Sequence, residues 1–260
     1  FLAIPFFVLT GEFMLRGGLL ERLVDFVNAY FGRAKGAIAV VTILVSLLMG
    51  AIVGLAVATA ASLGSFLIPM MKKEKYDPAF AAAVMSSASL LGPIMPPSVL
   101  MITYCIAAGN TSIAGLFMTA VVPAILIALV QTAMAIFISN KRNYPSYPKT
   151  TWEQKKKATF RALPALLLPV IILGGIFGGV FSVTEASAIA ALYSGFLAFV
   201  VYRNAKIADI PEIFKSAALS SGLTLILVGA GMTMSWAITN ERIVDILTAS
   251  LSGLAPWQFL

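Results

Sequence analysis

Three prolines and a glycine interrupt one of the most apolar stretches of the sequence. Pro93, Pro96 and Pro97 follow Gly92 within GPIMPPSV, and no charged side chain occurs between positions 78 and 140. Each proline removes a backbone N–H donor and frees a carbonyl in the preceding helical turn, while glycine accepts backbone angles that other residues avoid. The spacing predicts a helix that is broken in its middle.

Four serines lie around this break, namely Ser86, Ser87, Ser89 and Ser98. Their hydroxyls and the freed carbonyls are hard oxygen ligands of the kind that a sodium ion takes, and broken helices are where secondary transporters bind such ions. A helix that begins near Ser98 would point its positive end at an anion. The segment therefore predicts a combined cation and anion site, with a proline kink that binds no ligand as the alternative.

The composition places this chemistry in a membrane. Hydrophobic residues make up 60% of the chain and charged residues 11%, with a mean hydropathy of +0.95, whereas soluble domains carry about a quarter charged residues. The chain has no histidine and a single cysteine, Cys105, which argues against transition-metal sites and histidine-based triads. The phosphate-binding pattern GxxxxGK[ST] is also absent from the sequence.

A second long apolar run is expected to position the break. Residues 36–71 carry no charge, and basic residues flank the run on both sides, so both of its ends are expected in the cytoplasm. The run either crosses the membrane twice or forms a re-entrant hairpin over about 37–71, and its small residues favour the hairpin. We expect the hairpin tip, Gly54 to Thr59, to complete the ion's coordination shell from the side opposite the break.

The remaining elements follow from the alternation of apolar runs and charges. An amphipathic stretch at about 16–35 predicts an interfacial arm helix, with an ordinary loop helix as the alternative. The broken helix is expected at about 79–108 and a crossing at about 112–139. A basic cytoplasmic loop is predicted over 140–161, and further crossings are predicted within 162–260.

Two acids lie in or near apolar segments. Glu185 in FSVTEASA is either a functional intramembrane acid or part of the cap of a helix that starts at Ser182 or Thr184. Glu12 lies near the end of the first apolar run and is interpreted as an interfacial anchor. Neither acid forms a recognisable catalytic constellation with the serines, so an intramembrane enzyme is the less favoured class.

Five motifs resemble, in order, the large membrane subunit of tripartite ATP-independent periplasmic (TRAP) transporters. They are FLAIPFFVLTGEFMLRGGLLERLVDF, LIPMM, KYDPAFAAA, SSASLLGPIMPPSV and GGIFGGVFSVTEASAIAALY. The resemblance implies an all-α, polytopic, elevator-type transporter of the ion transporter superfamily, in a bacterial or archaeal inner membrane. It implies import of an organic acid with sodium as the coupling ion, and no other cofactor or nucleic acid. The implied partners are a periplasmic binding protein and a small membrane (Q) subunit.

The resemblance also divides the chain into repeats. Residues 1–139 correspond to a first inverted repeat, and 162–260 to the truncated start of a second one whose matching hairpin would lie beyond Leu260. One departure concerns the hairpin tip, where the family usually reads SGSAVAD and this chain reads VGLAVAT at 53–59. The tip therefore lacks two hydroxyls and a carboxylate. A sodium-coupled dicarboxylate symporter of the same superfamily that works without a binding protein is the alternative function.

Overall fold

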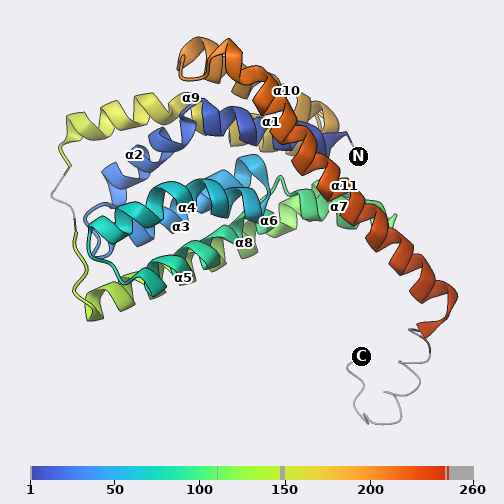
Figure 1. Ribbon diagram of the computed structural model, residues 1–260, viewed down its shortest axis with the longest axis horizontal. Helices are drawn as coiled ribbons and strands as arrows, with labels where there is room; N and C mark the ends of the chain where they lie inside the picture. The colour runs from blue at the N-terminus through green and yellow to red at the C-terminus, as the bar shows by residue number, and fades with distance from the viewer. Residues whose placement is uncertain (1, 110, 147–149, 244, 246–260) are drawn as a thin grey trace, which may run out of the picture. The chain divides into compact units, whose positions relative to one another are not determined.

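The computed structural model describes residues 2–109, 111–146, 150–243 and 245, and every regular element within them is helical (Figure 1). The elements are α1 (Ala3–Arg16), α2 (Leu19–Phe31), α3 (Ala37–Val53), α4 (Ala56–Lys73), α5 (Pro78–Ser89), α6 (Leu91–Ile94), α7 (Val99–Ala108), α8 (Ile113–Lys141), α9 (Trp152–Phe177), α10 (Val183–Phe196), the π-helix η1 (Leu197–Val201), the 3₁₀-helix η2 (Ile207–Asp209) and α11 (Ile210–Asn240). The predicted all-α class is confirmed.

The chain divides into two units, Phe1–Ala218 and Leu219–Leu260. The first holds α1 to α10 and the start of α11, and all sequence-predicted site residues lie in it. Within the described part of the second unit, α11 continues to Asn240 and exposes large apolar side chains such as Ile226 and Trp236. Residues 246–260 of the segment expected to begin a second repeat lie outside the described residues.

Helix α3 forms the core of the first unit. All of its side chains are buried except Leu44, Leu47 and Leu48, and it contacts α2, α4, α5 and α8. A helix that is apolar on every side is stable only where other elements surround it. Glycines with positive φ stand at both ends of α3, Gly36 (φ +75°) and Gly54 (φ +67°), and they let the chain turn sharply there.

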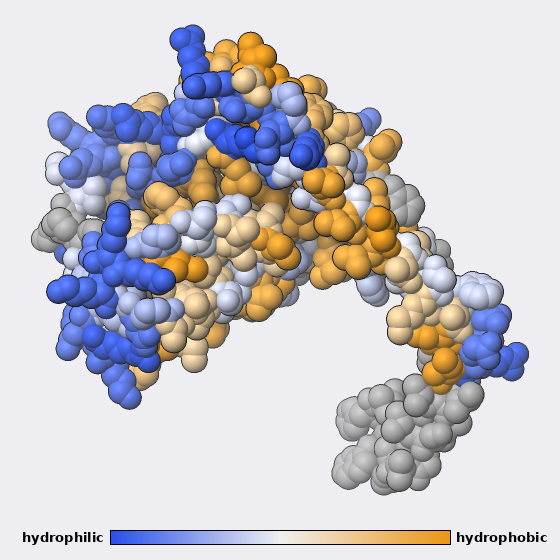
Figure 2. Space-filling model, viewed as in Figure 1, coloured by the Kyte–Doolittle hydropathy of each residue, from blue (hydrophilic) through white to orange (hydrophobic). Residues whose placement is uncertain are grey.

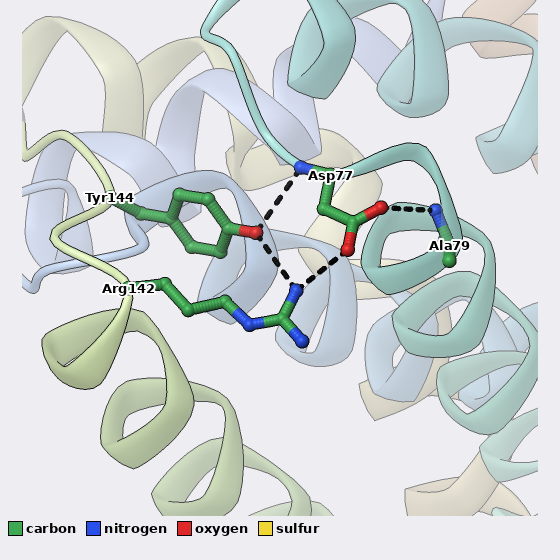
Figure 3. A network of polar contacts seen from close by, with 4 residues as sticks. All are labelled: Asp77, Ala79, Arg142 and Tyr144. Carbon is green, nitrogen blue, oxygen red and sulfur yellow. Dashed lines mark hydrogen bonds and ion pairs between the residues drawn. The ribbon is translucent and has the colours of Figure 1, made fainter.

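A polar network joins the α4–α5 turn to the end of α8 (Figure 3). Asp77 accepts hydrogen bonds from the Ala79 N–H at 2.9 Å and from Arg142 Nη1 at 2.8 Å, and its own N–H donates to the Tyr144 hydroxyl at 3.1 Å. The Ala79 N–H and the Arg142 guanidinium lower the pKa of the Asp77 carboxyl. The network fixes the end of the hairpin opposite its tip.

The loop predicted over 140–161 is shorter than expected. Helix α8 ends at Lys141 and α9 already begins at Trp152. The Thr151 N–H donates to Gln154 Oε1 at 2.9 Å, so a reciprocal cap starts the helix ten residues before the predicted crossing. Residues 147–149 of this loop lie outside the described residues.

Four described helices are long and apolar enough to cross a membrane, and up to six if each of two bent pairs counts as one span. One pair is α1 and α2, whose axes meet at 73°. Gly18, with φ +66°, makes this bend between them. The predicted arm at 16–35 corresponds to α2, and the predicted crossing at 112–139 corresponds to α8.

Candidate functional site

The broken helix is present where the sequence predicts it. After α6 ends at Ile94, residues 95–98 are not helical, and α7 begins at Val99 with its axis bent by 45° from the preceding helices. Met95 and Ser98 both have extended backbone angles, and the Pro96–Pro97 peptide bond is cis. Pro96, Pro97 and Ser98 are buried, so protein covers this irregular backbone, as the interior of a membrane requires.

Ser98 holds the two sides of the break together. Its hydroxyl donates to the Pro93 carbonyl at 2.6 Å and accepts from the Met101 N–H at 3.3 Å. The side chain thus caps α7 and uses one carbonyl of the preceding segment. Sequence reasoning assigned this hydroxyl to an ion, whereas in the structure it first stabilises the break itself.

The hairpin tip is the second interruption. The chain leaves α3 through Gly54, whose N–H donates to the Gly50 carbonyl at 3.1 Å, and Leu55 is extended before α4 begins at Ala56. Leu55, the N-cap residue of α4, makes no side-chain hydrogen bond to the first turn of that helix. Thr59 is buried, and its hydroxyl donates to the Leu55 carbonyl at 2.8 Å.

The tip and the break contact each other through their backbones. A β-carbon placed on Gly54 would collide with the Pro97 carbonyl oxygen, and one on Gly92 would lie 3.1 Å from the Leu55 carbonyl oxygen and 3.2 Å from Thr59 Oγ1. Only glycine permits this approach. We call this contact between residues 50–59 and 91–98 the tip–break junction. It brings together the predicted residues Gly54, Thr59, Gly92, Pro97 and Ser98.

Helix ends of opposite polarity meet at the tip–break junction. Helix α3 ends there, while α4 and α7 begin there. The carbonyl end of a helix carries partial negative charge and the N–H end partial positive charge. The junction can therefore stabilise a cation and an anion without any charged side chain, and the residues 50–59 and 91–98 include none.

The other predicted serines bond within their own helix. Ser87 Oγ donates to the Val84 carbonyl at 3.1 Å, and Ser89 Oγ donates to the Ser86 carbonyl at 2.8 Å. Ser86 itself is exposed. No hydrogen bond among the described residues joins these three hydroxyls to the hairpin tip, so their assignment as ligands remains a prediction.

Sequence reasoning missed Gln131 on α8. Its Nε2 donates to the Ser87 carbonyl at 2.9 Å, which ties the end of α5 to the neighbouring helix. Gln131 lies 18 residues after Ile113 and ten residues before Lys141, in a 29-residue helix whose single charged residue is Lys141 at its end. A lone amide in such a helix is itself a signal, because polar groups in a membrane interior need a partner.

Glu185 caps the start of α10. Its Oε2 accepts from the Ser182 N–H at 2.8 Å, and its own N–H donates to Ser182 Oγ at 3.3 Å. Ser182 rather than Thr184 is thus the N-cap residue. A functional role for Glu185 beyond this cap stays a prediction. Glu12 accepts a hydrogen bond from the Ser216 hydroxyl at 2.6 Å, which ties α1 to the start of α11.

Comparison with known proteins gives the same family along the whole chain. The family model described as "Tripartite ATP-independent periplasmic transporter, DctM component" matches residues 1–260. The chain is 41% identical to a protein of Salmonella typhimurium named YgiK, over 100% of this chain and 60% of that protein. It is 36% identical to the C4-dicarboxylate TRAP transporter large permease protein DctM of Pseudomonas aeruginosa, over 100% of this chain and 61% of the relative.

A third relative is the sialic acid TRAP transporter large permease protein SiaM of Vibrio cholerae, 36% identical over 95% of this chain and 57% of that protein. The chain thus spans about 60% of the length of these curated relatives. Relatives named as permeases, together with four to six candidate spans, identify a multi-pass inner-membrane protein and not an enzyme. The chain belongs to the family of DctM components, the large permease proteins of TRAP transporters.

Proposed function

We propose that this chain forms part of a sodium-coupled permease subunit that imports a small organic acid. A periplasmic binding protein delivers the acid, and a small membrane (Q) subunit assembles with the chain. The observation that carries the proposal is the tip–break junction, where two interrupted helices touch through Gly54, Gly92 and the Pro97 carbonyl. Interrupted backbone at membrane depth is tolerated where protein or a water-filled cavity covers it, and secondary transporters form their binding sites at such interruptions.

The length of α3 supports a re-entrant hairpin. Its 17 residues span about 26 Å at 1.5 Å per residue, less than the roughly 30 Å of the hydrocarbon core. The tip would then lie within the membrane, at the depth where transporters of this kind bind their ions. Because the tip contacts the break, the two segments would move as one body in an elevator motion.

The ion would be held by neutral oxygens. The junction offers the Leu55 and Pro97 carbonyls and the Thr59 hydroxyl, and Pro93 and Pro96 belong to the same segment. The N–H groups at the start of α4, which the side chain of Leu55 does not cap, would face the anionic substrate, and Val57 in that turn is 83% exposed. A carboxylate fits this polarity, and the named relatives carry a C4-dicarboxylate and sialic acid, both carboxylic acids.

Uptake into proteoliposomes that contain the intact permease and its Q subunit tests the function. We expect accumulation of a labelled carboxylate when the binding protein is outside and a sodium gradient points inward, and none when potassium replaces sodium. Equal uptake in potassium would contradict sodium coupling. Full uptake without the binding protein would favour the symporter alternative.

A further inference from the structure

The first three turns of α9 combine exposed aromatic and basic side chains on one face. Trp152, Lys156 and Phe160 follow each other at intervals of four residues, so they share one side of the helix. Trp152 is 66% exposed and Phe160 is 74% exposed. Such exposure of two large aromatic rings is unfavourable in water and is typical of the boundary between lipid and water.

The same face continues into the apolar part of α9. Leu163 and Leu167 are the next exposed residues along it. Going from Phe160 to Lys156 advances about 6 Å along the helix axis, which matches the thickness of one headgroup layer, about 5–7 Å. Along this face, the leucines thus match the hydrocarbon layer, Phe160 its boundary and Lys156 the headgroup layer.

Within the part of the chain that the structure describes, the basic residues of this segment form no ion pair. Residues 152–161 hold four basic residues and one acid, Glu153. The ion pairs among the described residues are Arg16–Glu212 and Arg142–Asp77, so Lys156 and Lys157 have no carboxylate partner there. Figure 2 shows hydrophilic residues gathered at this end of the first unit.

The segment is held in place and is not a free tail. The Tyr30 hydroxyl at the end of α2 lies 2.9 Å from Thr159 Oγ1, and Lys155 Nζ lies 5.3 Å from the centre of the Tyr30 ring. Tyr30 and the adjacent Phe31 are themselves exposed. The exposed aromatic residues at the end of α2 therefore lie beside the segment of α9 that carries the exposed aromatic and basic residues.

We propose that this surface, formed by Tyr30, Phe31, Trp152, Lys156, Lys157 and Phe160, binds the headgroups of anionic phospholipids in the cytoplasmic leaflet. The lysines supply positive charge that the protein does not neutralise, and phosphatidylglycerol carries the complementary charge. The aromatic rings insert beside the glycerol backbone at the same depth. The inference does not depend on the transported substrate or on sodium coupling.

Fluorescence of Trp152 tests the inference directly. In a Trp236→Phe, Trp257→Phe background Trp152 is the only tryptophan of this chain. The purified protein is placed in phosphatidylcholine bilayers that contain a minor fraction of brominated lipid. We expect brominated phosphatidylglycerol to quench Trp152 more strongly than the same fraction of brominated phosphatidylcholine.

Two double variants distinguish lipid binding at this surface from a general effect of the protein's positive charge. Lys156→Gln with Lys157→Gln should reduce the advantage of phosphatidylglycerol by about fivefold or more, because each basic residue near an anionic surface contributes about fivefold. The matched control, Lys72→Gln with Lys73→Gln, removes two exposed lysines at the α4–α5 turn and should leave quenching unchanged. Equal quenching by both lipids, no quenching by either, or an equal loss in both variants would overturn the proposal.

Discussion

The segment from α3 to α7 and the long helices α8 and α9 are both apolar, but they are built in different ways. The first is cut into short helices that meet at the tip–break junction, with glycine at the points of closest approach. The others run for 29 and 26 residues and expose large apolar side chains such as Phe137 and Val170. Interrupted backbone is enclosed by protein, whereas continuous helices can face lipid.

The largest expected effect comes from Gly54→Ala. The left-handed backbone there costs a β-carbon about 1–2 kcal/mol, and displacement of the Pro97 carbonyl adds about 1–3 kcal/mol. Gly179→Ala is the control, because Gly179 has φ +69° with nothing within 4 Å of an added β-carbon. Denaturation in mixed micelles should show a clearly larger loss of unfolding free energy for Gly54→Ala than for Gly179→Ala. Uptake should be lost in Gly54→Ala alone. Equal losses of unfolding free energy would mean that the contact with Pro97 adds nothing to the cost of the left-handed backbone.

Ser98→Ala should have the next largest effect. It removes the hydrogen bond to the Pro93 carbonyl and the cap of α7, at a cost of about 1–2 kcal/mol in unfolding free energy. The matched variant is Ser112→Ala, which removes the exposed cap of α8. If the two variants lost the same stability, the bridge across the break would contribute nothing beyond an ordinary cap.

Gln131→Leu tests the link between the two regions. The leucine fills similar space but removes the side-chain donor of the Ser87 carbonyl, which keeps the Leu90 N–H at 3.3 Å. The loss of such a hydrogen bond costs about 1 kcal/mol in a membrane interior. Met134→Leu on the exposed side of α8 is the control and should change stability by less than about 0.5 kcal/mol. A stable Gln131→Leu variant with normal uptake would show that α5 needs no anchor on α8.

The smallest effect concerns the network at the opposite end of the hairpin. The pKa of Asp77 is lowered in the folded protein, so its contribution to stability is complete above its unfolded value of about 3.9 and is lost as pH falls through the folded pKa. Stability should therefore not change with this group between pH 6 and 8. Asp77→Asn keeps a capping side chain and should remove part of the loss of stability below pH 4. An unchanged acid profile in that variant would assign the loss to other carboxyls.

The sequence predicts the position of both interruptions because their causes are local. Prolines stop a helix wherever they occur, and a charge-free run too long for one crossing has to turn back. The cap formed by Ser182 is equally local and was one of two starts expected for that helix. These features depend on residues that are close in sequence, so they can be predicted without knowledge of the tertiary structure.

The sequence analysis expected the tip to face the break, but the individual contacts across the junction could not be predicted in the same way. The approach of Gly54 to Pro97 depends on how two segments pack, and glycine and alanine are too common in this chain to single out one pair. The hydrogen bond from Gln131 to Ser87 joins residues 44 positions apart. The early start of α9 was missed because a run of lysines suggested a loop, although the Thr151–Gln154 cap favours a helix.

The contact between Gly54 and Pro97 involves main-chain atoms, and this determines which experiments can detect it. Gly54→Ala displaces the Pro97 carbonyl by steric contact, but alanine in place of the other side chains keeps every peptide carbonyl and does not report what those oxygens bind. Replacing single amides by esters through semisynthesis would weaken one carbonyl at a time while leaving each side chain intact. A contact made by the main chain sets few requirements on the neighbouring side chains, so a tip such as VGLAVAT, which has no acid, can still present its carbonyl oxygens.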